Sequence, residues 1–239
     1  MRLLLWIAVA LTLAVVAAGE RAQAQQAPQA SARQAAWPPK LEEPAPGEVE
    51  VLPVRGNVHV IMGAGGNVTV QVGEQGILLV DTGIAAMSEK VWAAVQKIAP
   101  PRKVLRYVIN TDEDPEHTGG NAVIAAKGQT VPLREANYTA GPQGSINYNR
   151  ASVVAHQNVL NRMSAPTGEK SPTPPAAWPD NTYAIDQKRF YFNDEPVVMM
   201  NFPGNTDGNT IVFFRKSDVI SVGDLLDLTR YPLIDLKAG

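Results

Sequence analysis

Four side chains that can bind a metal ion lie within six residues near the middle of the sequence. They are Asp112, Asp114, Glu116 and His117. Carboxylate oxygen and imidazole nitrogen are common metal ligands, and a divalent cation would relieve the repulsion between neighbouring carboxylates. The cluster therefore predicts a metal site. A solvated acidic turn that caps the following helix would use the same residue types and is the alternative.

The segments on either side of this cluster indicate how it is positioned. Residues 104–109 alternate and end apolar, which is typical of a buried strand. Gly119 and Gly120 allow the backbone to turn sharply before a helical pattern that begins near Asn121. We therefore expect the acidic cluster on a loop that leaves the end of a strand and leads into a helix.

The order of residues in this stretch resembles the signature of the metallo-β-lactamase superfamily, T-H-x-H-x-D-H-x-G-G-N. The positions that match are Thr111, His117, Gly119, Gly120 and Asn121. Asp112 and Asp114 stand where the family has two histidines, and Glu116 stands where it has the aspartate. The resemblance implies that the frame of the metal site is kept while oxygen replaces most of its nitrogen ligands.

Two further segments resemble the same family. Residues 78–83 read L-L-V-D-T-G, and residues 219–225 match a strand that ends in G-D-x-L. In the family the first aspartate orients a metal ligand, so the resemblance assigns that role to Asp81. A helix N-cap formed by Asp81 or Thr82 is the alternative. The second aspartate bridges two metal ions in the family, and this role falls on Asp224.

The remaining two histidines and one asparagine are not expected to bind a metal. Residues 203–209 resemble the family's loop H-T-x-G-[DN], whose ligand histidine falls on Asn205; we expect a turn residue there rather than a ligand. His59 lies within a strand pattern and is expected to be a hydrogen-bonded structural histidine. His156 opens a segment similar to the A-H-E-N-V of periplasmic family members and is expected to be structural or to line a pocket.

The ligand set implied by the resemblance is mostly oxygen. The family's first metal position would have Asp112, Asp114 and Asn205, and its second would have Glu116, His117 and Asp224. Such a set suits Mn, Mg, Ca or Fe(II) as well as zinc, because zinc favours nitrogen and sulfur. With three histidines, the chain has fewer than the dizinc hydrolases of this family usually use.

The resemblance implies an exported hydrolase that acts on a small-molecule substrate with a metal-activated water. Glu116 would take the place of the catalytic aspartate, with Asp81 orienting a ligand. The alternative is a non-catalytic family member that keeps the fold without efficient hydrolysis and binds no metal. Substrates differ widely on this scaffold, so the fold does not select one.

Composition limits the classes of function. Of 239 residues, 45% are hydrophobic and 18% charged, which describes one globular domain with a sizeable core. The formal net charge of -2 gives no electrostatic basis for binding nucleic acid. Cysteine is absent, so disulfides, thiolate metal sites and cysteine nucleophiles are excluded.

The N-terminal residues predict export. Residues 1–24 have Arg2, an apolar run over 3–18 and the small-residue pattern Ala22-Gln23-Ala24, which together indicate a cleaved signal peptide. An uncleaved anchor is the alternative, but the run is shorter than the roughly 20 residues that span a bilayer. Residues 25–48 are rich in Ala, Gln and Pro and are expected to be a disordered linker. We therefore expect a periplasmic or secreted protein that has no membrane contact after cleavage.

Short strands and one helix follow. Residues 58–61 and 68–72 predict a hairpin, residues 77–80 a buried strand, and Ser88–Ile98 a helix. Hairpins followed by strand–helix alternation predict an α+β fold with a mixed sheet. The resemblance covers residues 51–239 of a domain that we place at 49–239, and it implies an αββα metallo-β-lactamase-like sandwich that lacks its last elements. The strand edge left open would favour an oligomer.

Overall fold

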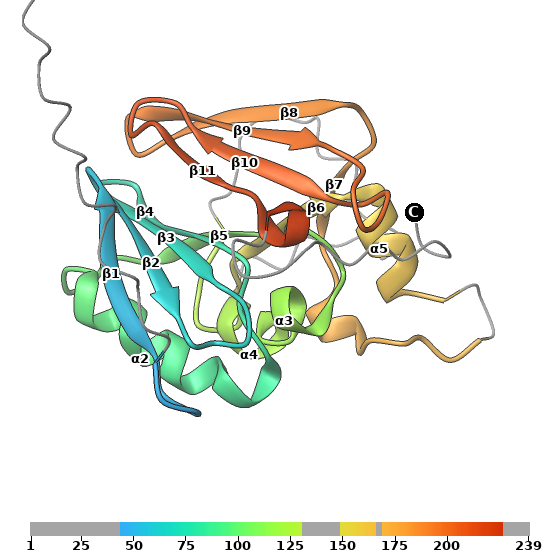
Figure 1. Ribbon diagram of the computed structural model, residues 1–239, viewed down its shortest axis with the longest axis horizontal. Helices are drawn as coiled ribbons and strands as arrows, with labels where there is room; N and C mark the ends of the chain where they lie inside the picture. The colour runs from blue at the N-terminus through green and yellow to red at the C-terminus, as the bar shows by residue number, and fades with distance from the viewer. Residues whose placement is uncertain (1–43, 131–148, 166–168, 227–239) are drawn as a thin grey trace, which may run out of the picture. The chain divides into compact units, whose positions relative to one another are not determined.

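Two β-sheets pack against each other in the computed structural model, which describes residues 44–130, 149–165 and 169–226 (Figure 1). The larger sheet contains, in spatial order, β1 (Glu50–Arg55), β2 (Val58–Met62), β3 (Val68–Gly73), β4 (Gly76–Val80), β5 (Leu105–Ile109), β6 (Ser152–His156) and β7 (Asn181–Tyr183). The smaller contains β11 (Val219–Ser221), β10 (Thr210–Phe214), β9 (Glu195–Asn201) and β8 (Gln187–Phe192). The helical elements are η1 (Ala85–Met87), α2 (Ser88–Ile98), α3 (Pro115–Thr118), α4 (Asn121–Ala125), α5 (Gln157–Met163), η2 (Pro175–Ala177) and η3 (Gly223–Leu225).

The direction of the strands determines where the polar residues gather. β1 to β4 pair antiparallel, whereas β4, β5, β6 and β7 pair parallel to one another. Parallel neighbours bring their carboxyl ends to one edge of a sheet, which is where ligands bind in open α/β sheets. Asp81 follows β4, Asn110 follows β5, and His156 ends β6. The chain therefore places three polar residues from distant segments along the same edge.

The apolar run of β4 is buried on both of its faces. Leu79 packs in a cluster with Val91 and Val95 of helix α2, while Leu78 packs in the inter-sheet cluster with Met199 of β9. A strand covered on both sides has no solvent-facing positions, which explains why its sequence is continuously apolar rather than alternating. Helices on one face and a second sheet on the other make β4 and β5 the rigid centre of the structure.

The elements predicted from sequence agree with the structure in most of the described residues. The helix expected at 88–98 has those bounds, with Val91 and Val95 buried. The loop expected at 112–120 contains the short helix α3, because Pro115 at the first helical position starts a turn after Asp114. Among the described residues, none of the helices is long and apolar enough to cross a membrane.

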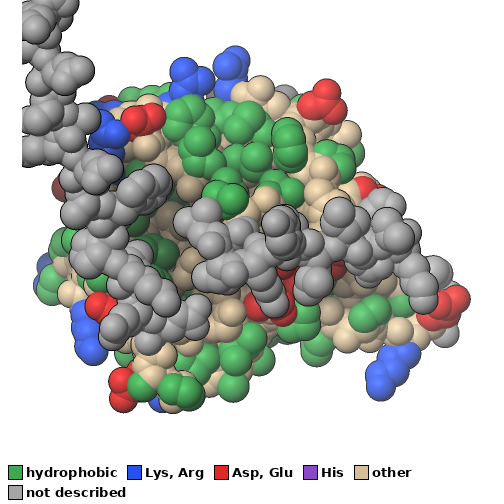
Figure 2. Space-filling model, viewed as in Figure 1, with side chains coloured by type: hydrophobic (Ala, Val, Ile, Leu, Met, Phe, Trp, Pro, Cys, Tyr) green, Lys and Arg blue, Asp and Glu red, His purple; other side chains and the backbone are tan. Residues whose placement is uncertain are grey.

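The outward face of the smaller sheet exposes apolar side chains. Tyr191 and Ile220 are 62% and 55% exposed, and Figure 2 shows hydrophobic side chains gathered over this sheet. In the part of the chain that the structure describes, β11 is an edge strand. Association through an open strand edge stays a prediction.

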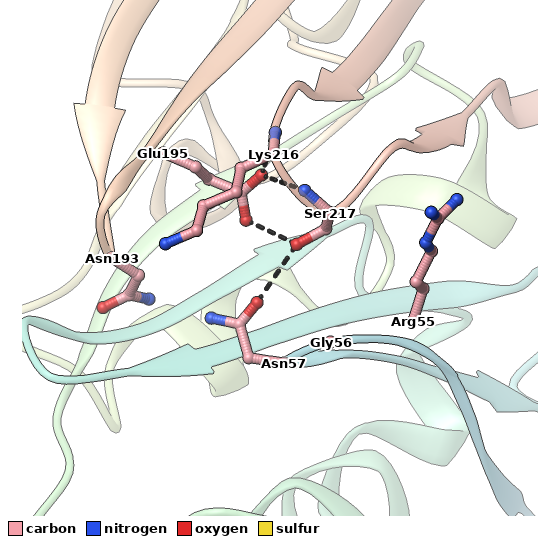
Figure 3. A pocket seen from close by; sticks show the side chains of 7 residues that line it. All are labelled: Arg55, Gly56, Asn57, Asn193, Glu195, Lys216 and Ser217. Carbon is pink, nitrogen blue, oxygen red and sulfur yellow. Dashed lines mark hydrogen bonds between the residues drawn. The ribbon is translucent and has the colours of Figure 1, made fainter.

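A buried carboxylate joins the two sheets near the amino end of β4, opposite the edge where Asp81 lies. Glu195 is 1% exposed, and its oxygens accept from Gln71 Nε2 at 2.6 Å, Ser217 Oγ at 2.8 Å, Ser217 N at 2.9 Å and Lys216 N at 3.0 Å. It lies beside a cavity of about 430 Å³ between the hairpin turns (Figure 3). Because four donors satisfy its lone pairs, we assign Glu195 a structural role.

We expect Glu195→Ala to lower the free energy of unfolding by about 3 kcal/mol or more, since several buried donors would lose their acceptor. The control is Asp194→Asn, one residue away and 76% exposed in its side chain, which should cost less than about 1 kcal/mol because asparagine also tolerates the left-handed backbone at this position. Urea unfolding measures both. Equal effects of the two substitutions would contradict the structural role of Glu195.

Candidate metal centre

The side chains singled out from the sequence converge at the carboxyl edge of the larger sheet. Two groups of three have ligand atoms within 4.8 Å of one another. The first contains Asp112, His117 and Asp224, and the second contains Asp114, Glu116 and Asp224. Asp224 belongs to both groups. The grouping differs from the one implied by the resemblance, which placed Asp112 with Asp114 and His117 with Glu116.

His117 is held between carboxylates on both sides of its ring. Its Nδ1 lies 2.8 Å from Asp81 Oδ2, and its Nε2 lies 3.0 Å from Asp224 Oδ1 and 3.7 Å from Asp112 Oδ2. Burial alone would lower the pKa of His117, but the charges of Asp81, Asp224 and Asp112 outweigh burial and raise this pKa to about 12. Without a metal the imidazole is therefore a cation that donates from both nitrogens.

Asp81 fixes both the ring of His117 and the start of the motif. Its Oδ1 accepts from Thr111 N at 2.8 Å, and its Oδ2 accepts from Thr111 Oγ1 at 2.7 Å as well as from His117. Its φ of 65° is a left-handed conformation that non-glycine residues rarely adopt and that often marks functional sites. The alternative role as a helix cap is wrong, because η1 and α2 are preceded by Ile84 and Met87.

Asp112 is fully buried, so the solvated-turn interpretation is wrong for this residue. Its oxygens accept from Asp114 N at 3.0 Å and from Asn209 Nδ2 at 3.3 Å. Burial raises the pKa of Asp112 to about 8, and this rise persists although His117 opposes it. Asp114 and Glu116 are half-buried, so the acidic residues extend from the buried interior at Asp112 to partly solvent-exposed positions.

The position of Asp224 depends on a close approach by Gly223. Gly223 has a φ of 53°, and a β-carbon there would lie 2.5 Å from Thr111 Oγ1. Because no larger side chain fits between η3 and Thr111, the glycine allows the following aspartate to reach His117. The sequence pattern G-D therefore has a steric reason in addition to a chemical one.

The backbone of the motif is fixed by the buried side-chain amides of Asn110 and Asn121, to which the sequence analysis assigned no role. The carbonyl of His117 accepts from Thr82 Oγ1 at 3.1 Å and from Asn110 Nδ2 at 3.2 Å. Asn110 and Asn121 also bond to each other at 2.8 Å. A polar residue at the end of an otherwise apolar strand was the available signal for Asn110.

The other predicted residues have mixed outcomes. Asn205 lies in a bend, as expected, but its buried Oδ1 has no hydrogen-bond partner in the described residues. His59 was expected to be fully hydrogen-bonded, and its buried Nδ1 has no partner there either. His156 is structural, since its Nδ1 accepts from Asn158 N at 3.3 Å and its ring lies edge-on to Tyr183.

The donor set fits a divalent cation. Several carboxylates crowd around one imidazole, and the raised pKa values of His117 and Asp112 show that protons on these two groups offset part of the repulsion when no metal is bound. Asp81 orients the imidazole in the way that a carboxylate supports a metal-bound histidine.

Comparisons with known proteins agree with this fold. The model of the family described as the metallo-beta-lactamase superfamily matches residues 62–237. A search of curated proteins found no match.

Similar solved structures include three metallo-beta-lactamases. The enzyme with a HARLDQ motif from Cronobacter sakazakii has 19% identity and a TM-score of 0.56, and the match covers 78% of this chain and 66% of that one. The subclass B3 enzyme BJP-1 of Bradyrhizobium japonicum has 19% identity, a TM-score of 0.51 and coverages of 70% and 57%. The subclass B3 enzyme MEM-A1 from a soil metagenome library has 20% identity, a TM-score of 0.51 and coverages of 72% and 58%. The chain thus spans less than two thirds of each of these structures, and at these identities the similarity shows the fold.

The protonated imidazole makes a prediction about pH. The pKa of His117 is about 12 in the folded protein against an ordinary value of 6.5, so between these values the folded state holds a proton that the unfolded chain has lost. This stabilisation is complete below about pH 6.5 and is lost as the pH rises toward 12. Asp112 acts in the same direction, because its raised pKa also lets the folded state hold a proton longer.

We therefore expect the metal-free protein to become less stable between about pH 6 and about pH 9. Urea unfolding in the presence of a chelator measures this slope. His117→Gln should make this slope smaller, since glutamine does not titrate, and leave the part that comes from Asp112. A wild-type stability that is constant or rises over this range would contradict the charged imidazole.

Proposed function

The chain belongs to the metallo-beta-lactamase superfamily, and from this membership we propose that it is an exported metal-dependent hydrolase with an oxygen-rich metal site. Its mixed sheets and short helices form the α+β sandwich of that superfamily. The observation that carries the proposal is the pair of ligand groups that share Asp224 at the edge of the sheets.

The residues that would hold the metal are those of the two groups. His117 and Asp112 would bind on the buried side, and Asp114 and Glu116 on the exposed side, with Asp224 between them. When bound, a divalent cation supplies a Lewis acid and lowers the pKa of a water molecule. Zinc is the metal suggested by the family, and Mn, Fe, Mg or Ca suit the oxygen ligands.

The chain's own residues prepare the site for that chemistry. Asp81 accepts a hydrogen bond from Nδ1–H of His117, which leaves Nε2 as the nitrogen that can bind a cation once its own proton is displaced. Glu116 takes the position of the family's aspartate, and its half-buried carboxylate is the one we propose for proton transfer to or from a substrate. The substrate is a small molecule with a carbonyl or phosphoryl centre.

A non-catalytic relative is the second candidate function. It is favoured by the way the cluster compensates its own charge, since the His117 imidazolium already lies between Asp81 and Asp224. A carboxylate-rich site also passes more negative charge to a metal than neutral imidazoles do, which makes bound water less acidic. The two candidates differ in whether a divalent cation binds at all.

Metal binding should be visible as a change in melting temperature. We expect Mn²⁺ or Ca²⁺ at about a hundredfold excess over its dissociation constant to raise the melting temperature by about 5 °C or more, because the ligand binds only the folded state. His117→Ala and Asp114→Ala should remove this rise. Asp218→Asn is the matched control, since Asp218 pairs with Arg55 on an exposed surface and lies in neither ligand group.

Zinc should stabilise the protein no more than Mn²⁺ or Ca²⁺ does, given the oxygen-rich ligands. If no divalent metal changes the melting temperature of a well-folded sample, the protein is a non-catalytic relative. A rise that survives His117→Ala would place the metal elsewhere on the protein.

Export makes a separate prediction about the mature N-terminus. The signal pattern ends at Ala24, so the protein recovered from the periplasm of a bacterial host should begin at Gln25. Intact-mass measurement distinguishes this product from the full chain. Recovery of a protein that still begins at Met1, attached to membranes, would support the uncleaved anchor instead.

A further inference from the structure

Arg162 of helix α5 contacts carboxylates on two different loops. Its Nη2 lies 2.8 Å from Asp207 Oδ1, and its Nε lies 3.2 Å from the same oxygen. The same Nε lies 3.3 Å from Glu113 Oε1. Glu113 sits inside the acidic motif, between two members of the ligand groups, and Asp207 belongs to the loop 202–209. One guanidinium therefore connects both loops to a helix outside the metal centre.

The two loops also bond directly to each other next to a ligand residue. Thr206 Oγ1 donates to Glu113 Oε2 at 3.3 Å, and Thr206 N donates to Asn209 Oδ1 at 2.8 Å. Asn209 Nδ2 then donates to Asp112 Oδ2 at 3.3 Å. A continuous chain of contacts thus runs from Arg162 to a carboxylate of the buried ligand group.

The burial of Glu113 explains why this series of contacts includes a positively charged side chain. Its side chain is 14% exposed and belongs to neither ligand group, so it adds negative charge to a loop that already carries three carboxylates. Removing a partner from such a carboxylate leaves an uncompensated charge that would draw the loop toward solvent. A guanidinium can serve two carboxylates through its planar fork, whereas a lysine ammonium is a single point charge.

We propose that Arg162 is a positioning residue of the metal centre, which holds the acidic motif and the loop 202–209 together so that Asp112 is fixed for metal binding. The metal part of this inference rests on the proposed function. The restraint on the two loops does not, and it is open to a separate measurement.

Hydrogen–deuterium exchange of the metal-free protein tests the restraint. In Arg162→Gln we expect the backbone amides of residues 203–210 and 110–118 to exchange about tenfold faster, since the loss of charged hydrogen bonds makes local opening easier. The amides of β8 and β9 away from the loop should be unchanged. Arg162→Lys should give an intermediate increase, and it remains informative if the glutamine variant folds poorly.

Calorimetric titration with Mn²⁺ tests the effect on the ligands. Arg162→Gln and Asp207→Asn should each weaken Mn²⁺ binding by about tenfold, and the double substitution should weaken it little further, because both break the same contact. Arg55→Gln is the control, since that arginine forms an exposed ion pair with Asp218 and contacts neither loop. It should change neither exchange at the loops nor Mn²⁺ affinity.

The outcomes separate the two claims. Unchanged exchange at both loops in Arg162→Gln would overturn the proposal. Faster exchange with unchanged Mn²⁺ affinity would also overturn it, because the loops would then be held without any consequence for the ligands. If the wild-type protein binds no Mn²⁺ and exchange still rises, the restraint stands while the metal role and the proposed function fail.

Discussion

The buried contact between His117 and its carboxylates is the interaction on which the rest of the site depends. Asp81 fixes one ring nitrogen at 2.8 Å and Asp224 faces the other at 3.0 Å, so the imidazole has no freedom to turn. Burial alone would keep this ring neutral, and the surrounding charges reverse that preference. Either a proton on His117 or a divalent cation can therefore balance the surrounding carboxylates. The proposed metal-dependent function requires the cation.

The fold supplies this contact by bringing three distant segments to one sheet edge. Parallel pairing of β4 with β5 places Asp81 beside Thr111, and the close approach at Gly223 brings in the segment after β11. The backbone of Asp81 is held in an unfavourable conformation, which only a rigid surrounding structure can maintain. Burial of β4 between a helix layer and the second sheet provides that rigidity.

Local patterns predicted the elements well, and the site only in part. The apolar run of β4 and the spacing of α2 are properties of neighbouring residues, so the sequence alone was sufficient for them. The closeness of His117 and Asp224 followed from resemblance, since they are separated by more than a hundred residues. Arg162 lacked any local signal, because its role comes from carboxylates on two loops that meet only in the folded chain.

An anomalous X-ray difference map from crystals grown with Mn²⁺ would test the metal centre most directly, because it locates the cation among named atoms. The proposed function predicts a peak beside His117 Nε2 and an oxygen of Asp224, with Asp81 still bonded to His117 Nδ1. A map in which His117 Nε2 keeps its hydrogen bond to Asp224 and no peak lies among the carboxylates would contradict a metal-dependent function.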